Sequence, residues 1–350
     1  MRTIINTAVY LPAHSRVQDS NVLPIFSCFN ANIGGVLKAC GYGDDVDFML
    51  NRQFHFYYWS SGKKIYFNCD LFSFFEDFRE FDKIEIVRTH YPSWRECQVA
   101  VNEEILAGVP VIATVDQYFV PFHKYYSKEH VTHSLLVIGV DDDSFYVTDI
   151  GGVKRLSFGE FESSLHSTHF ELITLVLPSE RREYGSEVIR SLIARNVEFG
   201  LNFGELNFAD GKYPTNNTGL EGANVFPGVH GIRKLANDLV RSFGERTEVE
   251  SEKLLSFYSD RSYEIVIQRF SHIAFLESAR KCLRGKELLI GEIIGDIHVL
   301  VHDWKVVKNL FHKARIKDRT DILQRISKRL SVIADKENLV FLKMKMLVDL

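Results

Sequence analysis

The sequence lacks any run of roughly 18 apolar residues, the length a membrane-spanning helix needs, so we expect no membrane partner. Its first stretch, "MRTIINTAVYLPAHS", has neither a long apolar core nor a small-residue cleavage site, so we expect no signal peptide. The five cysteines are odd in number and contain no Cys-x-x-Cys pair, which argues against a disulfide framework and against a zinc site. Together these absences favour a cytoplasmic location.

Dense basic patches are also missing, so we expect no nucleic-acid partner. The net charge is only −4, but it is unevenly spread: basic side chains outnumber acidic ones after residue 231, and the reverse holds before it. A basic C-terminal surface could dock an acidic partner protein. Two separately solvated domains would explain the asymmetry equally well, and 350 residues are enough for about two domains.

The first half of the chain mixes helical and strand patterns. Apolar residues at helical spacing predict a helix over 29–40, ended by Gly41 and Gly43, and a second over 94–107. Aromatic runs on either side of Ser61-Gly62-Lys63 predict a hairpin. Apolar runs predict four further strands, over 109–115, 133–140, 144–150 and 170–178.

A Gly- and Asn-rich stretch over 199–231 has little periodicity and predicts a long loop, one that could fold over a site. After it the pattern is helical almost to the end. We therefore predict an α+β domain over 1–180, a linker and covering loop over 181–230, and an all-α domain over 231–350.

Cys28 lies where the first predicted helix begins. A thiol attacks as its thiolate, and a helix N-terminus or a nearby imidazolium lowers its pKa. The alternative for any single cysteine is a small buried apolar side chain.

His133 opens one predicted strand and Asp149 ends the next, so a tight antiparallel hairpin would bring them side by side. An acid beside a histidine fixes its tautomer and stabilises the imidazolium. His130 is a rival base, but it precedes the strand. A cysteine on a helix N-terminus, followed by His and Asp on neighbouring strands, is the chain order of papain-like thiol enzymes. We therefore predict that Cys28, His133 and Asp149 are catalytic, with ordinary structural roles as the alternative for each.

The segments "SCFNANIGGVLKACGY", "LAGVPVIATVDQYFVPFHKYY" and "HSLLVIGVDDDSFYVTDI" resemble the butirosin-biosynthesis-H type acyltransferase family. The looser match of "GVHGIRKLANDLVRSF" and "YEIVIQRFSHIAFLESA" extends the resemblance into the helical half. The family's N-terminal domain is similar to papain-fold and C39-type peptidases. The resemblance thus implies a papain-like fold, in which a helix carrying the cysteine packs on an antiparallel sheet, before the all-α domain.

The resemblance also implies transfer of an acyl or peptidyl group from a carrier-protein thioester to a small amine, in antibiotic or other natural-product biosynthesis. Cys28 would accept the acyl group, His133 would act as base and acid, and Asp149 would orient His133. The papain-like oxyanion glutamine has no counterpart, because Val22 occupies its position. Asn21 and Gln18 are the nearby candidates, beside the backbone N–H of Cys28.

Tyr118, Tyr125 and Tyr126 could line a substrate pocket with their polar ends, or pack in the core. We predict no metal and no bound organic cofactor, the substrate arriving on the phosphopantetheine of an acyl or peptidyl carrier protein.

A cysteine hydrolase, either thioesterase or peptidase, would need the same three residues. A non-catalytic module that binds the carrier protein is a further alternative. The oligomeric state stays open, with a homodimer as one candidate.

Overall fold

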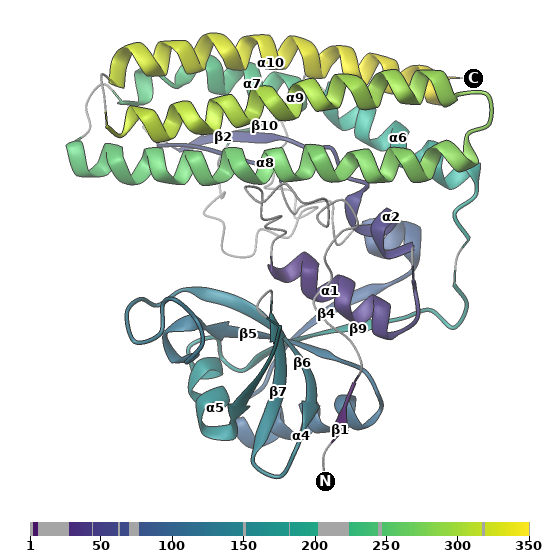
Figure 1. Cartoon of the computed structure of the whole chain (residues 1–350), viewed down its shortest axis with the longest axis vertical. Coiled ribbons are helices and arrows are strands. Elements are labelled where there is room, and N and C mark those ends of the chain that lie inside the picture. The colour runs from purple at the N-terminus through teal and green to yellow at the C-terminus, as the bar shows by residue number, and fades with distance from the viewer. Residues whose placement is uncertain are drawn as a thin grey trace. The chain divides into compact units, whose positions relative to one another are not determined.

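The computed structural model of the chain describes residues 3–5, 28–43, 45–61, 64–69, 77–149, 152–181, 183–201, 224–243, 247–316 and 319–349. They form two compact units (Figure 1). The first comprises Met1–Leu50 and Asp77–Arg182, and the second comprises Asn51–Glu76 and Glu183–Leu350.

The first unit contains a seven-stranded antiparallel sheet in the order β4-β9-β5-β6-β7-β8, with β1 paired to the C-terminal end of β6. Its strands are β1 (Thr3–Ile4), β4 (Glu85–His90), β5 (Val111–Asp116), β6 (Thr132–Val140), β7 (Ser144–Asp149), β8 (Gly152–Ser157) and β9 (Glu171–Val176). A glycine at position 139 permits the pairing with β1, because a Cβ there would lie 2.4 Å from the carbonyl oxygen of Thr3.

The helical segments of this part of the chain are α1 (Cys28–Ala39), α2 (Asp45–Asn51), the π-helix η2 (Phe78–Asp82), α4 (Trp94–Leu106), the short η3 (Gln117–Phe119) and α5 (Phe158–His166). Local signals fix where two of them begin. The Ser93 side chain accepts a hydrogen bond from the backbone N–H of Glu96 at the start of α4. Ser157 and Glu160 form a reciprocal capping box at the start of α5.

The two faces of the sheet are covered by different helices. Alternate residues of β6, among them Leu135 and Val137, join a buried core with α4 and α5. Successive side chains of a strand point to opposite faces, so Ser134 points to the other face, where it meets Asn32 of α1. Figure 1 shows α1 across the sheet from α4 and α5. This arrangement brings the start of α1 to the strand that carries His133.

The second unit consists mainly of helices, with a small antiparallel sheet in the order β10-β2-β3. Its elements are β2 (Tyr57–Ser61), β3 (Lys64–Asn68), α6 (Ser186–Leu201), β10 (Asn224–Pro227), α7 (Gly228–Asp238), η5 (Arg241–Phe243), α8 (Glu248–Cys282), α9 (Glu287–Ala314) and α10 (Arg319–Val348). Three long helices, α8, α9 and α10, run alongside one another (Figure 1). Among the described residues, no helix is both long enough and apolar enough to cross a membrane.

The buried centre of the second unit includes an ion pair. The Arg269 guanidinium of α8 donates to both carboxylate oxygens of Glu337 on α10, at 2.9 and 2.8 Å, and both side chains are fully buried. The indole Nε1 of Trp304 on α9 donates to the same carboxylate at 3.0 Å. One carboxylate thus links all three long helices through charge-assisted hydrogen bonds.

The sequence prediction of an α+β protein with antiparallel strands and a helical C-terminal region is confirmed. Two finer expectations are wrong. Residues 51–76 do not belong with a continuous 1–180 domain, because β2 pairs with β10 in the second unit, which is therefore not all-α. The predicted linker over 181–230 contains α6 and β10, because Ile189, Ile193 and Val197 give α6 a buried apolar stripe. Of the predicted loop over 199–231 that could cover a site, residues 202–223 lie outside the described residues.

Candidate active site

The β6–β7 hairpin carries two of the three predicted catalytic residues. Its register pairs Leu136 with Thr148, so His133 and Asp149 lie together at the open end of the hairpin. His133 Nε2 lies 3.2 Å from Asp149 Oδ2, within hydrogen-bond distance. Both side chains are largely shielded from solvent, with 13% and 16% of their surface exposed. The hairpin predicted from the sequence therefore brings the two groups into contact.

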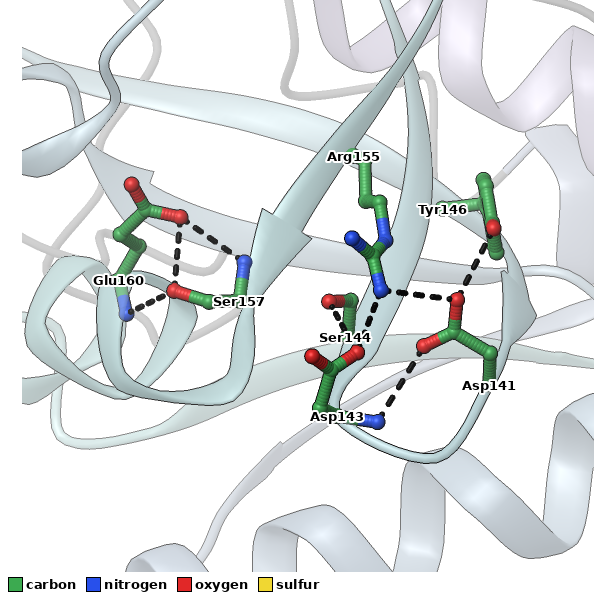
Figure 2. A network of polar contacts seen from close by, with 7 residues as sticks. All are labelled: Asp141, Asp143, Ser144, Tyr146, Arg155, Ser157 and Glu160. Atoms are coloured by element: carbon green, nitrogen blue, oxygen red, sulfur yellow. Dashed lines mark hydrogen bonds and ion pairs between the residues drawn. The ribbon is translucent and has the colours of Figure 1, made fainter.

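The closed end of the hairpin is held by a polar network (Figure 2). Tyr146 Oη donates to Asp141 Oδ2 at 2.9 Å, and Arg155 of β8 donates to both Asp141 and Asp143. The backbone N–H of Asp143 donates to Asp141 Oδ1 at 3.3 Å. The acidic turn thus ties β6, β7 and β8 together, and this fixes the register that aligns the open end.

Cys28 is the first residue of α1 and hydrogen-bonds with His133 and Ser134. Burial raises the pKa of the Cys28 thiol, but the hydrogen bond and charge of His133, helped by Ser134, bring this pKa below its usual value of 9.0. Burial lowers the pKa of His133, yet the hydrogen bonds to Asp149 and Cys28 raise it to about 9. These opposite shifts favour a thiolate beside an imidazolium.

Asn32 anchors α1 against β6. Its amide Nδ2 donates to the backbone oxygen of Ser134 at 2.9 Å and lies 3.2 Å from the Ser134 hydroxyl. Asn32 is 1% exposed, so its loss would leave buried polar groups without partners. Cys28 lies one helical turn before Asn32 on the same face of the helix. This contact therefore holds the thiol at the strand that carries His133.

His130, the rival base, lies elsewhere. Its Nδ1 is 2.7 Å from Asp116 Oδ2, its ring stacks on Tyr118 with centroids 4.3 Å apart, and 67% of its side chain is exposed. It borders a surface pocket of about 420 Å³ together with Asp116 and Phe119. Among the histidines that the sequence offered as bases, the structure brings His133 to Cys28.

The predicted substrate-binding tyrosines differ in their surroundings. Tyr118 stacks on His130, the Tyr125 ring lies 4.5 Å from the Lys124 ammonium, and Tyr126 is 44% exposed. These contacts do not test a role in substrate binding, which stays a prediction. The two predicted oxyanion residues, Gln18 and Asn21, lie outside the described residues.

His123 belongs to this site and was missed by sequence reasoning. Its Nε2 lies 3.3 Å from Asp149 Oδ2, and its ring packs edge-on against His133 with centroids 4.7 Å apart. The only signal for it was a histidine within the aromatic segment 116–126. His123, His133 and Asp149 offer one nitrogen or oxygen each, all within 4.8 Å of one another, which is a group that could hold a metal ion. The expectation that the protein uses no metal stays a prediction.

Comparison with known protein families finds a match in the part of the chain that contains this site. The model described as "Butirosin biosynthesis protein H, N-terminal" matches residues 27–150, a span from the start of α1 to the end of β7. Residues 27–150 are thus similar to the butirosin biosynthesis protein H N-terminal family. The family region contains Cys28, His133, Asp149 and His123. No curated protein matches the chain.

Proposed function

We propose that this protein is a thiol acyltransferase of natural-product biosynthesis. The family match supports a role in antibiotic biosynthesis and favours acyl transfer. The observation that carries the proposal is the convergence of Cys28, His133 and Asp149 from one helix and two strands of a single unit. A cysteine-bearing helix on an antiparallel sheet is also the arrangement expected of a papain-like fold.

In the first half of the reaction, the Cys28 thiolate attacks the carbonyl carbon of an acyl thioester carried on phosphopantetheine. The tetrahedral intermediate collapses, the carbon–sulfur bond to the carrier breaks, and His133 gives its proton to the departing thiolate. The acyl group is then a thioester of Cys28. The exchange is close to neutral in energy, because one thioester replaces another.

In the second half, a small amine attacks the acyl-enzyme and His133 takes a proton from the attacking nitrogen. The carbon–sulfur bond to Cys28 breaks, the amide leaves, and the thiolate–imidazolium pair is restored. Asp149 holds Nε2 of His133, which leaves Nδ1 for the sulfur and the amine. The backbone N–H of Cys28, at a helix N-terminus, is the group we assign to the oxyanion.

The donor is a carrier protein in this proposal. Acyl and peptidyl carrier proteins that present phosphopantetheine are acidic, and the sequence after residue 231 carries an excess of Lys and Arg. We propose that this basic part of the chain contributes to docking the carrier. With the acyl group delivered in this way, the proposed reaction requires no bound organic cofactor.

Intact-protein mass spectrometry with a panel of acyl-pantetheine thioesters tests the proposal. We expect a mass gain equal to the acyl group in the wild type and in Cys40→Ala, and none in Cys28→Ala. Cys40 is the matched control, because it follows the same helix and is also partly exposed. A loss of the adduct on adding amines, with amide formed, supports transfer. Release by water alone would instead assign a hydrolase.

The binding-module alternative predicts a different pattern. No adduct with any donor, together with a Cys28 that resists iodoacetamide at neutral pH, would contradict the thiol mechanism. Carrier binding that persists in Cys28→Ala while acyl transfer is lost would separate docking from chemistry and support the enzyme.

A further inference from the structure

The carboxylate of Asp149 faces two imidazoles, although the proposed triad needs only one. His133 Nε2 and His123 Nε2 lie 3.2 and 3.3 Å from the same oxygen, Oδ2. The two histidines come from different segments, His133 from β6 and His123 from the turn that follows η3. The second imidazole therefore needs its own explanation.

His123 Nε2 forms no hydrogen bond with any of the described residues. The atom is buried, and although it lies 3.3 Å from Asp149 Oδ2, the geometry is not that of a hydrogen bond. A buried nitrogen without a partner is unfavourable, because it has lost its hydrogen bonds to water and gained none in the fold. A cation placed between the three groups would accept its lone pair and remove that cost.

The spacing of the three atoms suits a tetrahedral ion. Zinc binds imidazole nitrogen and carboxylate oxygen at about 2.0–2.2 Å, so two ligands of a tetrahedral zinc lie about 3.3 Å apart. The two contacts to Asp149 Oδ2 match that separation, and all three atoms lie within 4.8 Å of one another. Two imidazoles and a carboxylate form a ligand set that binds zinc in preference to Mg²⁺ or Ca²⁺.

We propose that His123, His133 and Asp149 form a binding site for Zn²⁺, and that the ion inhibits the enzyme reversibly by taking the base of the triad. Zinc binds the lone pair of His133 Nε2 and displaces the proton held there to solvent. The remaining proton stays on Nδ1, so His133 can no longer accept one from Cys28 or from the amine. The ion is an inhibitor and not a cofactor, and this inhibitory part rests on the proposed function.

Zinc affinity is measured on the full-length protein, stripped of metal with a chelator, by competition with a chromogenic zinc indicator. We expect the wild type to bind one equivalent of Zn²⁺ and His123→Gln to bind at least tenfold more weakly. His130→Gln is the matched control, because His130 also lies against a carboxylate but outside the group, and it should bind like the wild type. Co²⁺ in place of zinc should give visible bands that are lost in His123→Gln.

Two further measurements separate this site from the acyl chemistry. Cys28→Ala keeps all three proposed ligands, so it should bind zinc in the same experiment even if no acyl transfer exists. In the wild type, zinc should stop amide formation and a chelator should restore it. Equal zinc affinity of the wild type and His123→Gln would refute the site. Zinc that binds there but stimulates transfer would refute the inhibitory role.

Discussion

Acid should destabilise the second, mainly helical unit through two buried histidines, His55 and His272. Burial, with the nearby Arg195 and Arg269 cations, lowers the pKa of His55 from 6.5 to about 3. Burial and Arg269 lower the pKa of His272 from 6.5 to about 3. Both are therefore neutral in the folded protein at pH 5, whereas both are protonated in the unfolded chain. Because their pKa is lower in the folded than in the unfolded state, the neutral histidines contribute their full share of the free energy of unfolding well above pH 6.5. That contribution is lost as the pH falls below 6.5.

The magnitude follows from proton linkage. A histidine with a pKa of about 6.5 unfolded and about 3 folded loses about 2 kcal/mol of stability between pH 7.5 and pH 5. Two such residues give about 4 kcal/mol, a large part of the 5–15 kcal/mol typical of a domain. Below about pH 6, the free energy of unfolding should fall by close to 2.7 kcal/mol for each pH unit.

Urea unfolding followed by tryptophan fluorescence measures this effect. Trp94→Phe serves as the background, because Trp59 and Trp304, both in the second unit, are then the only tryptophans. We expect His272→Phe to roughly halve the loss of unfolding free energy between pH 7.5 and pH 5, because one of the two titrating groups is gone. His298→Gln, on the exposed side of α9, should keep the full slope. Stability that stays level from pH 7.5 to pH 5, or an unchanged slope in His272→Phe, would refute the reasoning.

Two further predictions concern the second unit and the candidate site. Glu337→Gln should lower the free energy of unfolding by about 3–5 kcal/mol, because it leaves the Arg269 charge buried without a counterion. Asp335→Asn on α10 breaks the exposed pair with Arg233 of α7 and should lower the free energy of unfolding by less than about 1 kcal/mol in the same denaturant titration. Equal losses in the two variants would contradict this. At pH 7 and without metal, iodoacetamide should label Cys28 far faster than Cys97, whose thiol pKa burial raises to about 12. Peptide mapping should also find slower labelling of Cys28 in Asp149→Asn, and an unchanged rate would show that Asp149 does not help to activate the thiol.

Local features of the sequence were enough to predict much of the first unit. The helix that begins at Cys28 carries its own apolar spacing and its terminating glycines, and β6 and β7 are joined by a three-residue acidic turn. In such elements the residues that decide the structure are neighbours in the chain. The prediction that His133 lies against Asp149 depended only on the hairpin, and the structure confirms that contact.

The errors have a different origin. Residues 57–61 form a strand of the second unit because they pair with 224–227, more than 160 residues later in the chain. The residues around 57–61 do not indicate which distant segment will pair with them. α6 was overlooked although Ile189, Ile193 and Val197 have helical spacing, so in that case the signal was present. His123 lies in a turn whose path depends on tertiary packing, so its approach to Asp149 could not be predicted from the residues around it.

The candidate site depends on three separate contacts that position its residues. Asn32 fixes the helix of Cys28 to β6, Arg155 holds the far turn of the hairpin, and the segment after η3 brings His123 to Asp149. Asp149 can stabilise an imidazolium only while its oxygen accepts the Nε2 proton of His133. A divalent ion at the same oxygen would replace that proton, so the geometry that prepares His133 for acyl transfer also exposes it to zinc. Because Nε2 of His133 can hold either the proton or the ion, acyl transfer and zinc binding should exclude each other.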